Sequence, residues 1–348
     1  LELQLSPQQH PFRIRNLWPS LLEKYTAAYK NKDEPVLSFQ RNVFFDKREE
    51  IRISDMKVLE LLYEEAKWNI LDGRYPCEPD DCDVLGGIQA RLELGPCDSE
   101  KHSPEFFKTR VRDFLPVRAC NAGWSWLNFS SKNGPEHRLF KQYSAISTST
   151  TTYKLLRKYL EYCWALPYYG SAFFKAQIEK PAKGITALIS HYDQPVLVAI
   201  NREGIHVIDV RESVILLSLR YREMSWNYAC PSKPENPNCL PCLFVQFKIQ
   251  FQNPQEFKVL QIFSRQAELM DKLISAFVDE LKHRPSWDDD EVDFAGPSSS
   301  QDDFGLPITP QKISSDSYIS DNIKKLSLAT FNEDGECTSC SGSWAFTK

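Results

Sequence analysis

The spacing of apolar residues changes at Pro167, and this change constrains the fold more than any other feature of the sequence. Before Pro167 the apolar residues recur with the period of about 3.6 that is typical of helices. After Pro167 they alternate with polar residues, which is the pattern of half-buried strands. We therefore expect an α+β multidomain protein in which a helical lobe, residues 15–166, precedes a β lobe, residues 167–284.

Three segments before Pro167 carry the helical spacing. The first covers residues 54–71. The second covers about residues 83–94, where the internal pair Gly86-Gly87 weakens helix formation. The third lies near the end of the lobe, and its apolar face consists of Tyr153, Leu156, Leu160, Cys163 and Trp164. Together these segments predict a helical lobe.

Strand patterns follow Pro167. Residues 196–200 and 205–209 are apolar runs joined by the turn Asn201–Gly204, which predicts a β-hairpin. Residues 224–228 and 245–251 alternate apolar and polar side chains, as half-buried strands do. The segment between these two strands holds four prolines, so we expect an exposed loop there.

A long helix is predicted at residues 264–283, with an apolar stripe of Met270, Leu273, Ile274, Phe277, Val278 and Leu281. Several strands followed by one amphipathic helix are typical of a β-sandwich that is plugged by that helix. Beyond Arg284 the sequence turns acidic and Ser-rich, and such a composition buries too little apolar surface to fold alone. We predict that residues 285–348 are disordered.

The chain opens at Leu1–Leu5 without Met and in an alternating pattern, so we expect a fragment that lacks upstream sequence. Its formal net charge of −5 argues against a global basic field that would recruit nucleic acid. The sequence contains no apolar run of the ~20 residues needed to span a bilayer, and no signal peptide pattern. A cytoplasmic protein is therefore expected, in which most of the ten cysteines are free thiols.

Four stretches occur in the order found in FERM domains, and together they resemble that family. Pro35–Phe45 looks like the strand that leads into the second FERM lobe, and Leu71–Cys77 looks like the turn that ends a helix of that lobe. Phe114–Pro116 stands where the family has a Leu-Pro pair. Leu166–Phe174 resembles the junction between the second and third lobes, so the likeness extends across most of the chain.

The resemblance implies three lobes. Residues 1–14 would be a remnant of a ubiquitin-like first lobe, and residues 15–166 would form the second lobe, which resembles acyl-CoA-binding protein and is all helical. Residues 167–284 would form the third lobe, a β-sandwich like those of pleckstrin-homology and phosphotyrosine-binding (PH/PTB-like) domains, capped by its C-terminal helix. Functions that need the first lobe cannot be assigned to this sequence.

The resemblance also implies a function. It is that of a non-catalytic scaffold or adaptor at the plasma membrane, which binds the cytoplasmic tail of a transmembrane protein. The branch of the family that the sequence resembles is associated with inactive rhomboid proteins of the sheddase pathway and with Wnt co-receptor signalling. The alternative is a lipid-recruited linker between membrane and cytoskeleton. A FERM-linked phosphatase or kinase would require an enzymatic domain outside this sequence.

Residue patterns for catalysis are missing from the sequence, including a phosphate-binding Gly-rich loop with Lys, His-Glu-x-x-His and Gly-x-Ser-x-Gly. We expect no enzyme, no cofactor and no metal. The pairs Cys239/Cys242 and Cys337/Cys340 have the spacing of zinc ligands, but they are far apart in the chain, so free thiols are favoured. His191 and His206 are expected to be ordinary residues of the sheet.

The candidate site is a peptide-binding groove. In folds of the phosphotyrosine-binding type, the strand at residues 224–228 exposes an edge beside the C-terminal helix, and an extended peptide adds to that edge. The alternative is that Met224, Trp226 and Tyr228 point into the core and that the edge binds nothing. The groove candidates are Ser225, Trp226, Asn227, Tyr228, Met270, Ile274 and Phe277.

Two further features involve charge. Lys175, Lys180 and Lys183 form a small basic cluster, for which a solvated face is favoured over a membrane patch, since a patch normally needs more charges. In the tail, Thr309-Pro310 and Lys324–Ser327 are candidate sites for phosphorylation, which would create or remove a docking charge.

Overall fold

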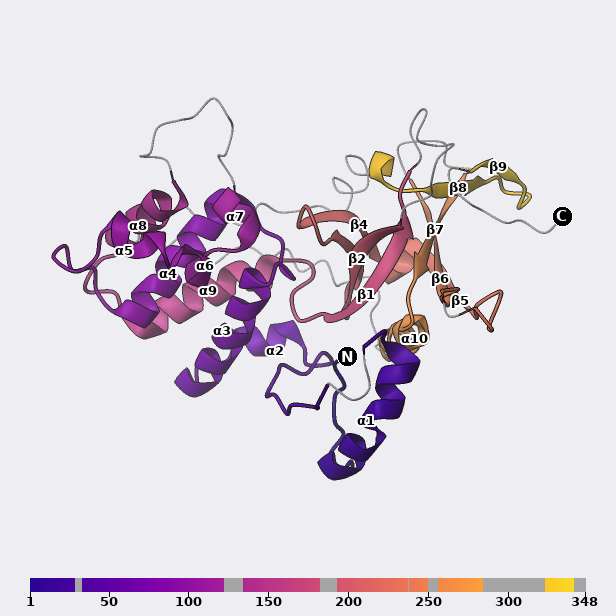
Figure 1. Cartoon of the computed structure of the whole chain (residues 1–348), viewed down its shortest axis with the longest axis horizontal. Helices are drawn as coiled ribbons and strands as arrows, with labels where there is room; N and C mark the ends of the chain where they lie inside the picture. The colour runs from indigo at the N-terminus through magenta and orange to yellow at the C-terminus, as the bar shows by residue number, and fades with distance from the viewer. Residues whose placement is uncertain are drawn as a thin grey trace.

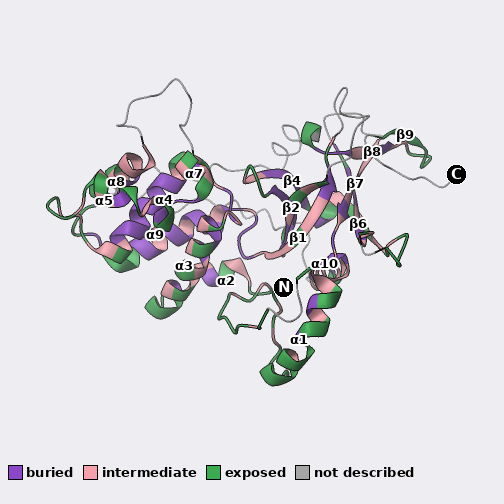
Figure 2. Cartoon of the chain, viewed as in Figure 1, coloured by how far each residue is buried: buried purple, intermediate pink, exposed green. Residues whose placement is uncertain are grey.

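The computed structural model describes residues 1–28, 33–121, 134–181, 193–236, 238–249, 256–283 and 323–340. In these residues a helical lobe and a β lobe lie side by side, and one N-terminal helix lies below the β lobe (Figure 1). Buried residues gather in the middle of each lobe (Figure 2). The predicted α+β fold class is therefore confirmed, with a helical part followed by an antiparallel sheet.

The helices of the N-terminal half follow one another closely along the chain. They are α1 (Pro11–Tyr25), α2 (Lys47–Ile51), α3 (Met56–Leu71), α4 (Pro79–Leu94), α5 (Pro104–Lys108), α6 (Val111–Phe114), α7 (Val117–Asn121), α8 (Pro135–Ala145) and α9 (Thr152–Ala165). Helix α3 agrees with the predicted segment 54–71, and its N-cap is Asp55, whose carboxylate accepts the Val58 N–H at 3.0 Å. Helix α9 buries the predicted stripe except for Tyr153, which is exposed.

Helix α4 begins earlier than the sequence predicts because Pro79 occupies its first turn, where a missing N–H costs nothing. Its glycine pair has a packing role. A Cβ added at Gly86 would lie 2.9 Å from the carbonyl oxygen of Phe114, and one at Gly87 would lie 2.9 Å from the carbonyl carbon of Gln142 in α8. The two glycines therefore let α4 approach α8 and the Phe114 segment closely, which offsets their weak helix propensity.

The β lobe is one curled antiparallel sheet with the strand order β4-β3-β2-β1-β7-β6-β5, to which β8 and β9 are added at β7. The strands are β1 (Ala172–Glu179), β2 (Asp193–Ile200), β3 (Gly204–Asp209), β4 (Val214–Arg220), β5 (Met224–Ala229), β6 (Cys242–Lys248), β7 (Phe257–Phe263), β8 (Leu328–Phe331) and β9 (Cys337–Cys340). Helix α10 (Ala267–Lys282) follows β7 and packs into the lobe.

The predicted hairpin is present, because β2 and β3 pair from Ile200 opposite Ile205 to Val196 opposite Asp209. The proline-rich segment after β5 contains no helix or strand in its described residues, as expected. The strand predicted at residues 245–251 begins earlier, at Cys242, and its last two predicted residues lie outside the described part of the chain.

The prediction of a disordered tail is wrong for residues 323–340. These residues form a 3-10 turn, Ile323–Lys325, and the strands β8 and β9 at the side of the sheet opposite α10 (Figure 1). Leu326 is 4% exposed and belongs to the same apolar core as α10. The acidic and Ser-rich composition of the whole tail concealed this short apolar run, which folds only because the sheet supplies its partner. The other residues predicted as disordered, including Thr309-Pro310, lie outside the described residues.

The alternating pattern of Leu1–Leu5 does not form a strand either, since residues 1–10 contain no helix or strand. An alternating pattern makes a strand only where a neighbouring strand accepts its hydrogen bonds, and none of the described strands pairs there. Among the described residues no helix is long and apolar enough to cross a membrane.

Candidate functional site

The end strand β5 is the centre of the candidate site. It pairs with β6, from Met224 opposite Phe247 to Ala229 opposite Cys242. Among the strands that the structure describes, no other pairs with β5, so one of its edges is unpaired. Such an edge presents backbone N–H and C=O groups that an extended peptide can pair with.

The side chains of β5 alternate between two surroundings. Trp226 and Tyr228 are half-buried and pack against the core of the β lobe, while Ser225 and Asn227 are exposed. The indole Nε1 of Trp226 donates a hydrogen bond to Oδ1 of Asp271 in α10 at 2.9 Å. This bond ties the candidate edge to the helix beside it. Burial raises the pKa of Tyr228, and a hydrogen bond with Cys230 adds to the rise.

The three groove candidates on α10 lie deeper than the sequence predicts. Met270, Ile274 and Phe277 are each 0% exposed and belong to the core of the β lobe. Phe277 packs against Phe44, with ring centroids 4.9 Å apart. The structure therefore brings Trp226 and Tyr228 to α10, but it leaves these three helix residues inaccessible to a ligand. Their regular spacing marks the face that the helix buries.

Helix α1 also lies near this site, which the sequence did not indicate. Nζ of Lys24, in its last turn, forms an ion pair of 2.9 Å with Glu268 in the first turn of α10. Lys272 and Lys24 both hold the pKa of Glu268 below its usual value by hydrogen bonding to its carboxylate. Leu22 is 1% exposed, so α1 is held by apolar contacts as well as by charge.

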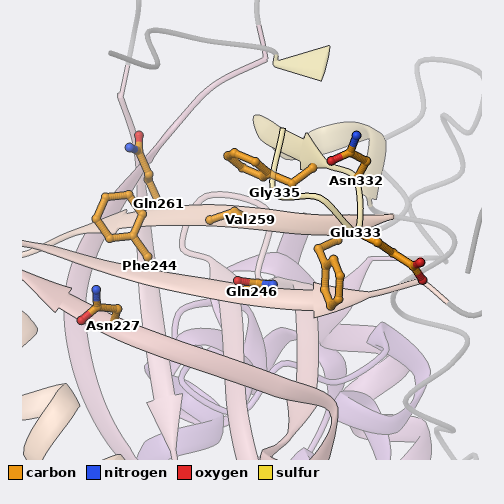
Figure 3. Close-up of a pocket in the computed structure, with 10 residues that line it drawn as sticks. Asn227, Phe244, Gln246, Val259, Gln261, Asn332, Glu333 and Gly335 are labelled. Carbon is orange, nitrogen blue, oxygen red and sulfur yellow. The ribbon is translucent and has the colours of Figure 1, made fainter. Parts of the chain in front are cut away.

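A hollow of about 520 Å³ lies on the outer face of the sheet, away from α10. Asn227, Phe244 and Gln261 form one row across β5, β6 and β7, and the turn after β8 overhangs the hollow (Figure 3). Four of the ten lining residues come from the tail. The residues that line it are Asn227, Phe244, Gln246, Phe257, Val259, Gln261, Phe331, Asn332, Glu333 and Gly335.

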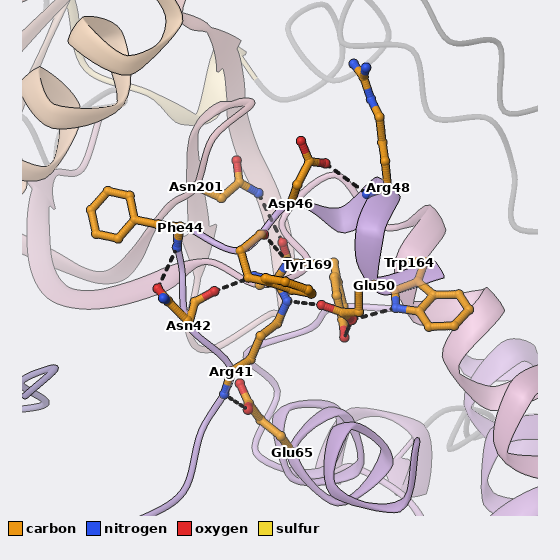
Figure 4. A network of polar contacts seen from close by, with 12 residues as sticks. Arg41, Asn42, Phe44, Asp46, Arg48, Glu50, Glu65, Trp164, Tyr169 and Asn201 are labelled. Carbon is orange, nitrogen blue, oxygen red and sulfur yellow. Dashed lines mark hydrogen bonds and ion pairs between the residues drawn. The ribbon is translucent and has the colours of Figure 1, made fainter. Parts of the chain in front are cut away.

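A buried polar network joins the segment before α2 to the end of the helical lobe (Figure 4). The Glu50 carboxylate, which is 0% exposed, forms an ion pair with Arg41. It also accepts hydrogen bonds from Trp164 Nε1 at 2.8 Å and from the Tyr169 hydroxyl at 2.5 Å. Burial raises the pKa of Tyr169, and the negative charge of Glu50 raises it further, so the phenol stays a donor. The network therefore ties the segment before α2 to the lobe junction.

Charged contacts also connect the two lobes. Arg202, in the turn between β2 and β3, bonds Asp46 ahead of α2 at 2.8 Å and also bonds Glu280 in α10. The adjacent Glu203 forms an ion pair of 2.5 Å with Lys47. These contacts tie α10 and the turn between β2 and β3 to the segment that leads into the helical lobe.

The other residues singled out in the sequence are dispersed. Among the described residues no group of three His, Cys, Asp or Glu side chains lies close enough to hold a metal ion. Cys242 is buried in β6, whereas Cys337 and Cys340 are exposed on β9. His206 is buried in β3, and its Nδ1 lies 2.8 Å from Ser218 Oγ.

The basic cluster is only partly described. Lys175 is exposed on β1, and Lys180 is exposed just after that strand. Lys183 and His191 lie outside the described residues. The structure therefore shows two exposed cations of this cluster and does not place the third.

Family comparisons agree with the two lobes. Residues 48–174 match the FERM central domain family, and residues 194–273 match the C-lobe of the FERM domain of KRIT1 and FRMD8. Among solved structures, the chain is similar to the human myosin 7b C-terminal MyTH4-FERM domain, in complex with the harmonin-a PDZ3 domain. That match has a TM-score of 0.44, with 16% identity over 77% of this chain and 47% of that chain. The chain is also similar to the complex of the FERM and C-terminal domains of Drosophila Merlin. That match has a TM-score of 0.41 and 14% sequence identity, and it covers 68% of each chain.

Relatives found by sequence have higher sequence identity to this chain than these solved structures do. The chain is 36% identical to FERM domain-containing protein 8 of Mus musculus, over 97% of this chain and 74% of that protein. It is 35% identical to the Homo sapiens protein over the same shares, and 39% identical to the Xenopus tropicalis protein over 79% of this chain and 62% of that protein. The chain therefore belongs to the FERM domain family, with FERM domain-containing protein 8 among its relatives.

Proposed function

We propose that this protein is a non-catalytic adaptor, and that it binds the cytoplasmic tail of a transmembrane protein by strand addition at β5. The observation that carries the proposal is the position of β5, which ends the sheet beside α10 with one edge unpaired among the described strands. Backbone pairing supplies affinity in this mode, and side pockets supply selectivity.

The chemistry of the groove supports this mode of binding. Trp226 and Tyr228 are half-buried and offer flat apolar surface with a polar group at one end, which suits peptide recognition. The hydrogen bond from Trp226 to Asp271 limits the rotation of the indole, so less entropy is lost when a peptide packs on it. The contact residues would be Ser225, Trp226, Asn227 and Tyr228. The buried Met270, Ile274 and Phe277 would support the groove from beneath.

The proposed partners are the cytoplasmic tails of inactive rhomboid proteins or of a Wnt co-receptor, because the sequence resembles the branch of the family with these associations. Binding to such a tail would place the protein in the cytoplasm at the plasma membrane. The small size of the basic cluster, which has three lysines in the sequence, supports this over recruitment by lipid, since a membrane patch normally needs several more charges.

The test uses peptides from both kinds of tail and two adjacent proline substitutions, Asn227→Pro and Tyr228→Pro. Successive N–H groups of a strand point to opposite sides, so one of these groups faces β6 and the other faces the open edge. The proline at the β6-facing position should unfold the strand. The proline at the edge-facing position should leave the fold intact and weaken tail binding by about tenfold. Binding weakens because one hydrogen bond to the peptide is lost and because the proline ring obstructs the peptide.

The control is Gln261→Glu, on the outer face of β7, which should leave both stability and affinity unchanged. Circular dichroism melting establishes which proline variant is folded, and fluorescence anisotropy measures the affinity. A folded proline variant that binds the tail peptides with wild-type affinity would reject strand addition at β5.

A further inference from the structure

The tail strand β8 completes the edge of β7. Strands β1 and β7 pair only at Gln177 opposite Phe263, so the first half of β7 has no partner from β1. Residues 257–260 of β7 instead pair with residues 331–328 of β8. Nζ of Lys258 bonds Thr330 Oγ1 at 2.8 Å, and Ala329 is 0% exposed. A segment distant in the sequence thus forms part of the sheet.

Ser327, which immediately precedes β8, is buried with an exposed fraction of 3%. Its Oγ has no hydrogen-bond partner among the described residues. It lies between Leu326, which enters the core of the β lobe, and Leu328, which packs against the same core. The hydroxyl is therefore a buried polar group without a partner among the described residues, and the docking of its neighbours holds it there.

The residues before Ser327 have a different character. Lys324 and Lys325 are exposed, and Lys325 forms an ion pair of 3.0 Å with Glu212 at the surface. Two lysines two and three positions before a serine form a charge pattern of the kind by which kinases select substrates. When the tail is undocked, this motif and the serine hydroxyl are both accessible in one extended segment.

We propose that Ser327 is a phosphorylation site for a kinase that reads basic residues, and that phosphorylation and docking of the tail exclude each other. In the reaction, Ser327 Oγ bonds to the γ-phosphorus of ATP while the bond from that phosphorus to the bridging oxygen breaks. ADP leaves, and the hydroxyl proton passes to the base of the kinase. The product carries a charge of about −1.5 to −2 at a position that the docked tail buries.

Such a charge cannot be accommodated in the docked position. Ser327 is 3% exposed and its Oγ has no hydrogen-bond partner among the described residues, so a phosphate there would be buried without a donor already in place. Phosphorylation should therefore release residues 323–340. Release removes the β8 partner of residues 257–260 of β7, which stay paired with β6, and removes Phe331, Asn332, Glu333 and Gly335 from the hollow on the outer face. The docked tail is thus a reversible part of the surface that this lobe presents.

The first test places a negative charge at Ser327 in the full chain and measures amide hydrogen exchange. Ser327→Glu should speed exchange by about tenfold or more in residues 328–331 and in those amides of residues 257–260 that face β8, because these amides lose their partners. The amides of Ser327→Ala should exchange at wild-type rates. This variant distinguishes the effect of an added negative charge from the effect of losing the hydroxyl. Ser339→Glu is the matched control, since Ser339 is exposed on β9. Unchanged exchange in Ser327→Glu would overturn the proposal, and so would release by Ser327→Ala.

The second test incubates the chain with ATP and the catalytic subunit of cAMP-dependent protein kinase, a kinase that reads basic residues, and locates phosphate by mass spectrometry. Ala329→Arg should release the tail, because Ala329 is 0% exposed, and should make phosphorylation of Ser327 at least about fivefold faster than in wild type. Absence of phosphate on Ser327 in this variant would overturn the proposal. So would a fully phosphorylated wild-type chain whose β8 amides remain protected.

Discussion

The guanidinium of Arg41 and the carboxylate of Glu50 form an ion pair whose side chains are 6% and 0% exposed. The pair lies in the polar network that ties the segment before α2 to Trp164 and Tyr169. A buried pair of this kind adds little net stability over an apolar replacement, but breaking it leaves one charge buried without a partner. The pair therefore specifies the geometry of the lobe junction.

Replacing one partner of this pair should be costly. Glu50→Ala leaves Arg41 buried without its anion and also removes the acceptor for Trp164 and Tyr169, so we expect a loss of about 3–5 kcal/mol in the free energy of unfolding. Urea denaturation measures the loss. Glu34→Ala is the control, because it breaks the exposed ion pair with Arg15 and should cost no more than about 1 kcal/mol. Equal effects of the two substitutions would contradict a structural role for Glu50.

His206 should make the protein less stable in acid. Burial lowers its pKa from 6.5 to about 4 in the folded state. Between these values the unfolded chain binds a proton that the folded chain does not, so stability falls as the pH drops through this range. From pH 7.5 to pH 5 the loss from this group should be about 2 kcal/mol.

The measurement is urea denaturation at the two pH values for wild type and His206→Gln. The glutamine of the variant does not titrate. The difference between its free energies of unfolding at the two pH values should therefore be smaller than that of wild type by about 2 kcal/mol, even if the substitution changes stability at both pH values. A pH dependence identical to that of wild type would show that His206 does not contribute.

Glu65 should change the pH dependence of stability in the opposite direction to His206. Burial raises the pKa of its carboxyl, although the Arg41 N–H that it accepts opposes the rise. The folded state therefore binds the proton more tightly than the unfolded state, and the contribution of this group to stability grows as the pH falls through its folded pKa. Glu65→Gln should be at least as stable as wild type at pH 7, and this advantage should shrink at pH 4. An advantage that grows toward low pH would refute the assignment.

The close approach of α4 to α8 should be sensitive to a single methyl group. Gly87→Ala places a Cβ 2.7 Å from Cβ of Gln142 and 2.9 Å from its backbone carbon, so we expect a destabilisation of about 1–3 kcal/mol. Gly134→Ala is the matched control, since the three atoms nearest to its Cβ all belong to the flexible carboxylate of Glu136. Thermal melting of both variants tests the difference, and a stable Gly87→Ala would mean that the helices can move apart without cost.

The sequence by itself determined the elements that carry a regular apolar period. Helix α3, helix α9, the β2–β3 hairpin and helix α10 were all predictable, because each buries a face whose spacing is set by local geometry. The motif order also identified the FERM family. Net charge limited the classes of partner, since it does not depend on how the chain folds.

Only the tertiary structure decided which of these faces are accessible. Trp226 and Met270 both belong to apolar stripes, but one is half-buried at the sheet edge and the other is 0% exposed beneath it. The tertiary structure also placed residues 328–331 in the sheet, whereas Leu1–Leu5 have no strand partner among the residues that the structure describes. Strand pairing and burial depend on contacts between residues far apart in the chain, so a local pattern cannot specify them.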